Sequence, residues 1–411
     1  MAVRTGGNLP LIKEQNATLI KEIIYKYSPI SRSEIAEALS LTPPTITTNV
    51  NALIREGLVR ECTGSMENGH TKNLGRRPVM LEFIPDSRYT LGIELGPYCT
   101  TFAIVDMQGN ETACLTEAVA DLQYQRMLDF VISTARSFLE KNSVSPEKTQ
   151  GVGIGLPGFI EAENGVIRNC YRGDWNGHHF ADDISKALGL KTCIENNVHA
   201  RAIGAEIFNR NLKADTFLYY FISYGLACSL VIKSDRITGR IAGAGEIGHM
   251  VVEPGGPKCD TCGNFGCLEA IASEHAIIKR CIQMNRSDTP GILREICADP
   301  SNPRIDEILK AQSCGDRLVG AIIQDAVKYL GINLANLINF ISPQAVLIDS
   351  YIMSLPENSE LMLQRVKKNL FGLNNQEVII DFMPYNALYG ARGAAAVAIK
   401  RLLLGPQIQE G

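Results

Sequence analysis

Four side chains of the kinds that bind zinc lie within one short stretch of this sequence. His249, Cys259, Cys262 and Cys267 supply one imidazole and three thiols, which match the ligand types and ligand number of a tetrahedral structural zinc ion. Glycines among the cysteines allow the backbone to wrap around a small ion. Because four protein ligands leave no open position for water, we expect a structural Zn²⁺. The alternative is a group of buried thiols that bind no metal.

The composition of the chain is typical of a soluble globular protein. Its 411 residues are 45% hydrophobic and 20% charged, which suits two or three domains. The other cysteines are scattered singly, so we expect no disulfide framework. The chain does not begin with a basic segment followed by an apolar one, and Asn, Pro and Asp interrupt its longest apolar run, Tyr329 to Met353. We therefore expect no signal peptide, no membrane span and a cytoplasmic location.

The charge of the chain is unevenly distributed. Residues 1–80 hold ten Lys or Arg and seven Asp or Glu, a net charge of +3, so a chain of net charge −4 carries −7 on the remainder. A basic N-terminal segment on an acidic body indicates contact with nucleic acid through the N-terminal segment.

The N-terminal segment has the pattern of three short helices between Thr18 and Arg60. Apolar residues recur at helical spacing in the first helix. Ser31 and Glu34 have the spacing of a capping box at the start of the second helix. Thr42 is expected to cap the third helix, and Pro43 takes its first position, where no N–H is needed.

The third helix has the polar face of a helix that reads a DNA groove. Its expected inward residues are Ile46, Val50, Leu53 and Ile54. Its expected outward residues near the N-terminal end are Thr45, Thr47, Thr48 and Asn49. Short polar side chains in this position suit contact with base edges in the major groove.

Two expected strands, at residues 58–60 and 79–84, follow these helices. Arg76 and Arg77 lie in the polar loop between them, flanked by Gly75 and Pro78. Paired arginines in such a loop suit phosphate or the minor groove. The segment therefore predicts a DNA-binding winged helix, and the alternative is a helical protein-interaction module.

The rest of the chain has an α/β pattern. Strands are expected at 90–95, 101–106, 151–155 and 216–224, and helices at 127–141 and 390–404. This layout predicts a two-lobed, actin-like (ribonuclease-H-like) ATPase-type fold. We expect residues 1–86 to form the winged helix-turn-helix with its wing and linker. Residues 87–200, with a returning C-terminal helix within 385–411, form the expected first lobe, and residues 201–384 form the second, which holds the zinc ligands.

Several motifs of the body resemble those of the ROK family, which comprises bacterial sugar kinases, repressors and open reading frames. The motifs are Leu156-Pro157-Gly158, Trp175-Asn176-Gly177, Glu195-Asn196-Asn197, Gly245-Glu246-Ile247-Gly248-His249, the zinc-ligand stretch through Glu269, and Gly390-Ala391-Arg392-Gly393. The resemblance covers nearly the whole chain, because the repressors of this family carry an added winged helix. The family usually has one residue between its first two cysteines, whereas Asp260 and Thr261 separate them here. A Cys-x-x-Cys pair still suits zinc.

The resemblance implies a sugar site beside the zinc ligands. In the family, the residues that match Glu246, His249 and Glu269 contact the sugar. Asn196 and Asn197 add amide groups that suit adjacent hydroxyls. His249 would bind zinc through one nitrogen and sugar through the other. Asn169 and Gly158 are weaker candidates, and surface or packing roles are expected for His178, His179 and His199.

The sequence lacks parts that a kinase of this family needs. Phosphoryl transfer requires phosphate-binding loops, a carboxylate for Mg²⁺ and a base. The first phosphate loop is replaced by Glu94-Leu95-Gly96-Pro97-Tyr98, in which Pro removes a donor and Tyr fills space. The second loop reads Ser223-Tyr224-Gly225, and Asp349-Ser350-Tyr351 replaces the adenosine-side Gly-Gly. Asn197 stands where the kinases have an Asp base, and an amide cannot deprotonate a sugar hydroxyl. We expect no catalytic residues.

These features predict a sugar-responsive transcriptional regulator, a repressor of genes for carbohydrate uptake or catabolism, that is not an enzyme. Its expected partners are operator DNA and a small sugar or sugar phosphate. The operator is expected to be palindromic because the protein is expected to form a homodimer or homotetramer. One alternative is an active ATP-dependent sugar kinase with an added DNA-binding domain. Another is a regulator controlled by a protein of the phosphotransferase system.

Overall fold

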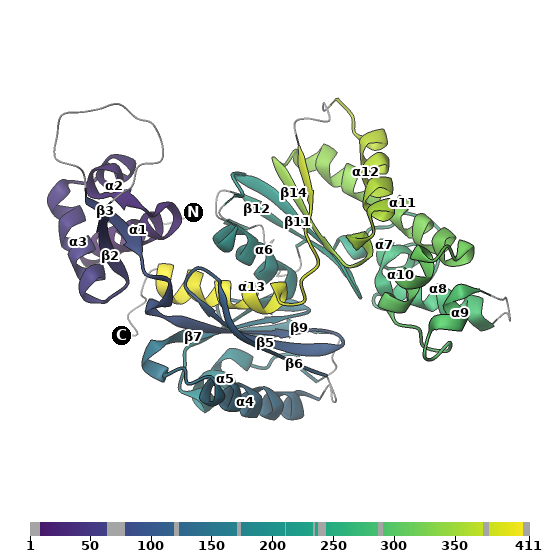
Figure 1. Cartoon of the computed structure of the whole chain (residues 1–411), viewed down its shortest axis with the longest axis horizontal. Helices are drawn as coiled ribbons and strands as arrows, with labels where there is room; N and C mark the ends of the chain where they lie inside the picture. The colour runs from purple at the N-terminus through teal and green to yellow at the C-terminus, as the bar shows by residue number, and fades with distance from the viewer. Residues whose placement is uncertain are drawn as a thin grey trace.

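The chain folds into an N-terminal winged-helix domain and a body of two lobes (Figure 1). The computed structural model describes residues 9–63, 79–118, 123–170, 174–209, 211–232, 235–236, 244–286, 291–372 and 378–405. Helices and strands alternate through the body, which confirms the predicted α/β class.

The winged-helix domain packs three helices on a small sheet. Its elements are α1 (Leu9–Tyr27), β1 (Ile30–Ser31), α2 (Arg32–Leu39), α3 (Pro43–Arg55), β2 (Val59–Thr63) and β3 (Val79–Phe83). The antiparallel strand order is β1-β3-β2, and Ile20, Ile35 and Ile46 are fully buried beneath it. α1 begins well before Thr18, since Pro10 is tolerated in the first turn of a helix.

The start of α2 follows the expected capping chemistry, and the start of α3 follows it only in position. The hydroxyl of Ser31 accepts a hydrogen bond from the Glu34 N–H at 3.2 Å, and the Glu34 carboxylate accepts one from the Ser31 N–H at 2.7 Å. This confirms the capping box of α2. Thr42 is the N-cap of α3, as expected, but its hydroxyl lies 2.9 Å from the hydroxyl of Thr45 and makes no capping bond.

The first lobe is built on a five-stranded sheet of order β10-β7-β4-β5-β6. Its strands are β4 (Tyr89–Leu95), β5 (Cys99–Asp106), β6 (Glu111–Ala118), β7 (Thr149–Leu156) and β10 (Thr192–Asn196), beside a hairpin of β8 (Phe159–Glu161) and β9 (Val166–Asn169). Helices α4 (Tyr124–Lys141) and α5 (Phe180–Leu188) cover one face, and α13 (Tyr389–Ala398) covers the other.

Helix α13 lies directly on the sheet because glycines remove the side chains beneath it. A Cβ at Gly92 would lie 1.9 Å from the carbonyl oxygen of Ala391, and one at Gly153 would lie 1.7 Å from that of Ala394. On its opposite side α13 meets α6 (Asn197–Phe208), where Gly204 faces Gly393. The C-terminal helix therefore returns to the first lobe, and a π-helix, η5 (Ile399–Leu404), continues it.

The second lobe is built on a sheet of order β13-β12-β11-β14-β15. Its strands are β11 (Thr216–Ile222), β12 (Leu226–Ile232), β13 (Asp235–Arg236), β14 (Ala345–Ser350) and β15 (Ile379–Phe382). Its helices are α7 (Leu268–Ala272), α8 (Glu274–Arg286), α9 (Ile292–Ile296), α10 (Ile305–Ser313), α11 (Arg317–Ile341) and α12 (Pro356–Asn369). Strands β11, β14 and β15 run parallel, and β12 and β13 complete the sheet in antiparallel fashion.

Helix α11 is long and apolar enough to cross a bilayer by length and composition, and among the described helices it is the one that meets this test. Core helices of soluble proteins meet it too. Ile323, Leu330 and Leu334 of α11 are fully buried in the core of the second lobe, so packing inside the protein accounts for its apolar residues.

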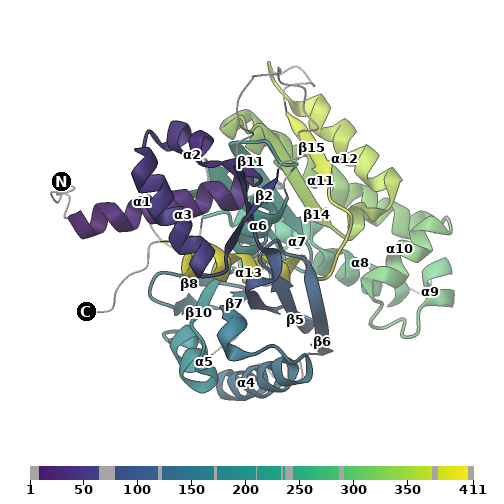
Figure 2. The same ribbon diagram turned by 60° about the vertical axis from the view of Figure 1, so that its left-hand side comes forward.

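Helix α6 joins the two lobes. Its residues Val198 and Ala202 pack against β11 and β14 of the second lobe. Ala200 and Ile203 pack against α13 of the first. The lobe boundary expected between residues 200 and 201 falls inside this continuous helix, because α6 has an apolar face for each lobe. Figure 2 shows α6 between α13 of the first lobe and β11 of the second.

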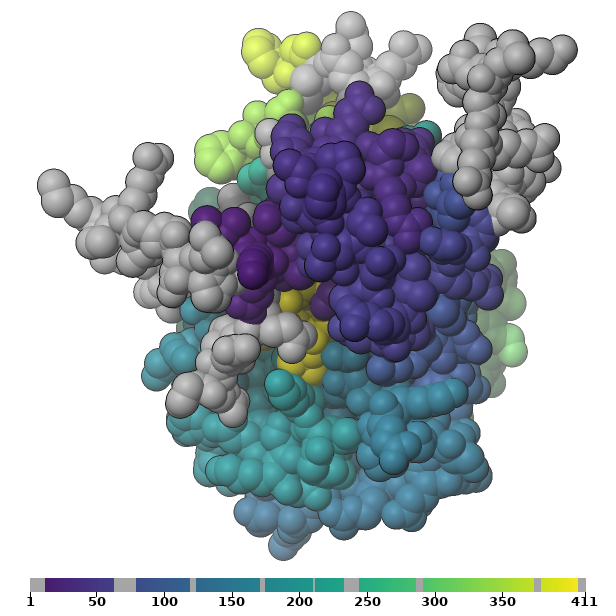
Figure 3. Space-filling model, turned by 90° about the vertical axis from the view of Figure 1, so that its left-hand side faces the viewer, coloured from purple at the N-terminus to yellow at the C-terminus, as the bar shows by residue number. Residues whose placement is uncertain are grey.

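The winged-helix domain is packed against the C-terminal end of the chain. Ile20, Ile24 and Tyr25 of α1 share one core with Ile399 and Leu403 of η5. The ammonium group of Lys21 donates to the carbonyl oxygen of Leu403 at 2.7 Å. Figure 3 shows the winged helix in purple above the first lobe, with the yellow C-terminal segment between them. The DNA-binding candidate and the body thus share apolar contacts as well as a chain connection.

Candidate functional site

The four predicted zinc ligands come together in the second lobe. The candidate ligand atoms of His249, Cys259, Cys262 and Cys267 all lie within 4.8 Å of one another. The Cys259 sulfur is 3.8 Å from Nδ1 of His249, and the sulfurs of Cys262 and Cys267 are 3.6 Å apart. Zn–S bonds of about 2.3 Å and Zn–N bonds of about 2.0 Å require separations of this size. The donor set fits a tetrahedral zinc ion.

Backbone pairing holds the loop that carries these ligands. Isolated β-bridges join Val251 to Cys267 and Lys258 to Phe265. Gly266 has a φ of +77°, and a Cβ there would lie 1.8 Å from the carbonyl oxygen of Glu253. The tight return of the loop therefore requires glycine at this position.

The two residues between Cys259 and Cys262 anchor the loop to its surroundings. Asp260 accepts a hydrogen bond from the ammonium group of Lys279 on α8 at 2.8 Å and lies 3.3 Å from His275. The Thr261 hydroxyl donates to Glu269 at 2.6 Å. The longer spacing noted in the sequence thus gives the loop an ionic contact to α8 and a contact to a predicted sugar residue.

Three of the predicted sugar residues lie around this loop. Burial raises the pKa of Glu246; the nearby His249 opposes that effect, and the charge of Glu269 adds to it. Glu269 accepts from the backbone N–H of Leu226 at 3.3 Å as well as from Thr261. Because Nδ1 of His249 faces Cys259, its Nε2 is left for another partner.

The two predicted asparagines lie at the start of α6. The side-chain oxygen of Asn196 accepts from the backbone N–H groups of Val198 and His199 at 2.9 and 3.2 Å. Its amide nitrogen donates to the carbonyl oxygen of Gly158 at 3.0 Å. Asn196 therefore acts as the N-cap of α6, which commits its acceptor to the helix. Asn197 follows as the first, half-buried residue of the helix.

His199 holds the loop of Glu246, a role that the sequence did not indicate. Its side chain is buried, and Nε2 lies 3.3 Å from the carbonyl oxygen of Ala244, just before Glu246 in the chain. Its Nδ1 lies 3.5 Å from Glu195. The packing role expected for this histidine agrees with its burial. The contact with Ala244 spans 45 positions, so no local signal could reveal it.

The segments that replace the kinase phosphate loops close on themselves. The N–H of Gly96 donates to the carbonyl oxygen of Cys99 at 2.9 Å, and that of Ser223 donates to Gly225 at 3.0 Å. The rings of Tyr98 and Tyr224, one from each lobe, meet edge to face at 5.6 Å. Two tyrosine side chains thus stand where these loops approach each other.

The candidate DNA-reading helix α3 presents only part of the predicted polar set. Thr47 and Thr48 are exposed. Thr45 and Asn49 are half-buried, and the Asn49 amide donates to the Thr45 carbonyl oxygen at 2.8 Å. The Thr45 hydroxyl lies 2.9 Å from that of Thr42, so these contacts of Thr45 and Asn49 are local to the start of the helix. Arg76 and Arg77 lie outside the described residues.

Two further exposed residues of α3 were missed by the sequence reasoning. Asn51 and Arg55 follow Thr47 at four-residue intervals and share its exposed side. Helical spacing from Thr47 was the signal that could have identified them.

Comparison with known proteins agrees with this architecture. The ROK family profile matches residues 90–401, and a winged helix-turn-helix DNA-binding profile matches residues 20–60. The xylose repressor of Bacillus subtilis is 28% identical over 395 residues, covering 95% of this chain and 97% of that protein. The transcriptional dual regulator NagC of Escherichia coli is 25% identical, covering 83% and 82% of the two chains.

Solved structures share the fold. A ROK family transcriptional regulator described as a homologue of the E. coli MLC protein superposes with a TM-score of 0.80 at 24% identity, covering 96% of this chain and 98% of that one. A ROK family glucokinase from Streptomyces griseus superposes with a TM-score of 0.65 at 22% identity, covering 76% and 99%. The two-lobed body is therefore of the sugar-kinase type that was predicted as actin-like. The chain belongs to the ROK family and carries a winged helix-turn-helix DNA-binding domain ahead of its ROK body.

Proposed function

We propose that this protein is a cytoplasmic, sugar-responsive repressor of genes for carbohydrate uptake or catabolism. The observation that carries the proposal is the packing of a winged helix, through α1, against a ROK body that contains a cluster of one His and three Cys of zinc-ligand type. The names of its relatives, a xylose repressor and an N-acetylglucosamine repressor, support this reading.

The proposed sugar site comprises Glu246, His249 and Glu269, with Asn197 at its edge and Asn196 supporting it through the cap of α6. Carboxylate and imidazole groups suit paired hydrogen bonds to neighbouring hydroxyls. A site built this way rejects an analogue that lacks one hydroxyl, because a buried polar group would lose its partner.

The proposed zinc ion is held by His249, Cys259, Cys262 and Cys267. When bound, it supplies structural rigidity and no open coordination position. The protein residues do the rest. The loop presents His249 and Glu269, the Thr261 hydroxyl orients the Glu269 carboxylate, and Asp260 ties the loop to α8.

The proposed DNA surface is the exposed side of α3 with Thr47, Thr48, Asn51 and Arg55, and Arg76 and Arg77 of the wing remain candidates. A homodimer or homotetramer would present two such helices to a palindromic operator. The sugar can shift DNA affinity only by its differential binding to two arrangements, typically about 1–3 kcal/mol.

Absence of kinase activity is part of the proposal. Asn197 occupies the base position, and Tyr98 and Tyr224 stand at the phosphate loops. The likeness to a glucokinase favours the alternative, an active sugar kinase. An ATP-coupled assay on a hexose panel separates the two, and turnover of any sugar contradicts the repressor reading.

The test of the sugar response uses the variant Glu246→Ala. Fluorescence anisotropy measures affinity for duplex DNA from the region upstream of the gene, with and without glucose, mannose, xylose, N-acetylglucosamine or N-acetylglucosamine 6-phosphate. We expect one sugar to change wild-type affinity by about 5- to 150-fold. We expect Glu246→Ala to lose that change while binding DNA as the wild type does.

Exposed Glu360→Gln serves as the control and should keep the response. If no sugar alters DNA affinity but a phosphotransferase-system protein does, the regulator answers to a protein partner and the sugar proposal fails.

A further inference from the structure

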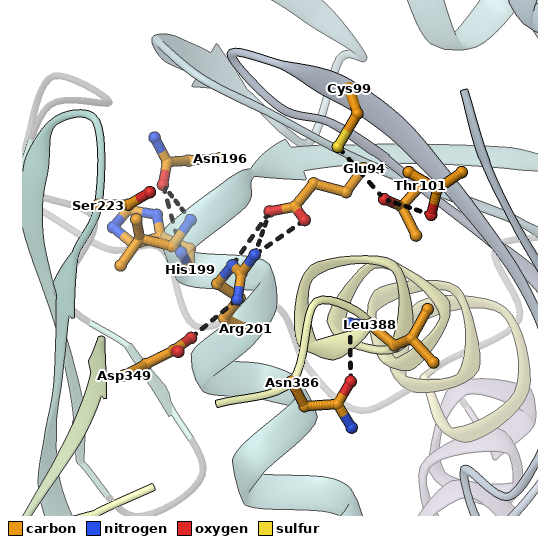
Figure 4. A network of polar contacts seen from close by, with 12 residues as sticks. Glu94, Cys99, Thr101, Asn196, His199, Arg201, Ser223, Asp349, Asn386 and Leu388 are labelled. Atoms are coloured by element: carbon orange, nitrogen blue, oxygen red, sulfur yellow. Dashed lines mark hydrogen bonds and ion pairs between the residues drawn. The ribbon is translucent and has the colours of Figure 1, made fainter. Parts of the chain in front are cut away.

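A buried arginine joins the two lobes at the centre of the molecule. Arg201 of α6 is 8% exposed. Its Nη2 donates to both oxygens of Glu94 at 2.7 and 2.8 Å, and its Nε donates to Glu94 at 3.0 Å. Its Nη1 donates to Asp349 at 2.8 Å (Figure 4). Glu94 lies near the end of β4 in the first lobe, and Asp349 near the end of β14 in the second.

The surroundings of these three residues fix their geometry. The hydroxyl of Tyr219 donates to Asp349 at 2.6 Å, and the guanidinium carbon of Arg201 lies 4.5 Å from the centre of the Phe221 ring. Gly390 makes room for Glu94, since a Cβ there would lie 1.8 Å from the carboxyl carbon. Burial tends to lower the pKa of Arg201, but the charges of Glu94 and Asp349 outweigh this and raise it. The guanidinium is therefore held in its charged form.

The folded state is stable with these three buried charges only while they remain in contact with one another. Removing a charge from water costs several kcal/mol, and a buried partner left unpaired is strongly destabilising. The two carboxylates come from different sheets, and the packing of the lobes brings both of them close to Arg201. The positive guanidinium then offsets two negative charges that would otherwise be buried together. Carboxylate oxygens are also ligands that a divalent cation such as Mg²⁺ accepts.

We propose that Arg201 is a resident cation that ties the two lobes together through Glu94 and Asp349, without nucleotide or metal. The tie sits where strands of both sheets end, beside the Tyr98–Tyr224 contact that also crosses between the lobes. Separation of the lobes at this point requires that the bonds of Arg201 to Glu94 or to Asp349 break. This inference is independent of the proposed sugar response.

The first test is Arg201→Ala, studied without DNA or sugar. We expect the melting temperature to fall by about 5 °C or more and the radius of gyration from small-angle scattering to rise as the lobes separate. Millimolar Mg²⁺ or Mn²⁺ should reverse part of both changes, because a cation can take the place of the guanidinium. If neither Mg²⁺ nor Mn²⁺ raises the melting temperature of this variant, the resident-cation role is wrong.

The control is Arg280→Ala, which removes a partly exposed ion pair with Asp325 inside the second lobe. It should change neither the radius of gyration nor the response to these ions.

A second variant keeps the test decisive if Arg201→Ala does not fold. The triple variant Glu94→Gln, Arg201→Met and Asp349→Asn leaves no unpaired buried charge, so it should fold. We expect its radius of gyration to exceed that of the wild type. Its melting temperature should not change when divalent ions are added. A radius equal to that of the wild type would overturn the proposal.

Discussion

At the scale of single residues, Glu274 is a carboxyl group that the protein keeps out of water. Its side chain is 4% exposed and accepts from the Ser223 hydroxyl at 3.4 Å. Burial raises the pKa of Glu274 from 4.5 to about 7, and the charge of Asp349 adds to the effect. The folded protein therefore binds a proton that the unfolded chain releases between these two values. Stability falls as pH rises through this window and levels off above about pH 7.

The variant Glu274→Gln removes this titration. We expect its free energy of unfolding at pH 8 to exceed that of the wild type by on the order of 2 kcal/mol, because the wild type must bury a charge there. Near pH 4.5 the advantage should vanish, since Glu274 is then protonated in the folded state and half-protonated in the unfolded one. Urea unfolding at both pH values measures the difference. Exposed Glu360→Gln should show no such pH dependence.

The variant Cys267→Ser tests the zinc cluster. With one ligand of four replaced, we expect metal analysis to find well under one zinc per chain and the melting temperature to drop. Cys281→Ser is the matched control, because Cys281 is also fully buried but lies outside the cluster. Equal zinc content in the two variants would remove Cys267 from the ligand set.

Some residues of the site could be predicted from the sequence and others could not. The zinc ligands could be predicted because His and Cys are zinc-binding residue types and lie close together in the sequence. Asn196 was read as a sugar contact, yet its acceptor caps α6 and its donor binds Gly158, 38 positions away. Arg201 was not singled out at all, since its partners lie 107 and 148 positions away. Contacts made only by the fold leave no local pattern.

At the scale of elements, α3 offers a graded test of DNA contact. We expect Arg55→Ala to weaken binding to all sequences alike and to reduce the salt slope by about one. Thr47→Ala should weaken binding to the operator more than to random duplex, because it lies nearer the N-terminal end that reads bases. Anisotropy titrations at several salt concentrations measure both. Lys310→Ala, on an exposed position of α10 in the second lobe, should leave both quantities unchanged.

Helix α13 supplies the second test at this scale. A Cβ at Gly390 would collide with Glu94, so we expect Gly390→Ala to lower the free energy of unfolding by about 1–3 kcal/mol. Gly320→Ala in α11 has nothing within 4 Å of its new Cβ and should raise it by roughly 0.5–1 kcal/mol. Chemical denaturation measures the free energy of unfolding of both variants. Equal values for the two variants would show that α13 shifts to accommodate the added methyl group.

Helix and strand patterns predicted the three helices and two of the strands of the winged helix and several elements of the body, because apolar periodicity and caps act locally. The capping box of α2 and the Pro43 start of α3 are examples. Periodicity did not reveal that α6 faces two lobes, because apolar residues on two sides of a helix do not say which partner each side meets. It also gave no sign that the last helix changes to a π-helix at Ile399.

At the scale of the whole molecule, the N-terminal segment and the body carry opposite net charges. Residues 1–80 carry +3 while the whole chain carries −4, so the acidic body repels a phosphate backbone that the winged helix attracts. In the proposed repressor, this imbalance favours approach of DNA to the winged-helix side of the molecule. Composition alone predicted this polarity, whereas the docking of α1 on η5 required the fold.

Helix α6 connects the region of the proposed sugar site with the winged-helix domain. Twelve residues long, it spans about 18 Å, with Asn196 capping the end near Glu246 and Phe208 packed against the winged-helix core at the other. Arg201, the proposed tie between the lobes, lies close to the middle of this helix. A tilt of about ten degrees there swings each end by roughly 1.5 Å. In the proposed repressor, a sugar bound beside the capped end of this helix would therefore displace the winged-helix domain packed at its other end.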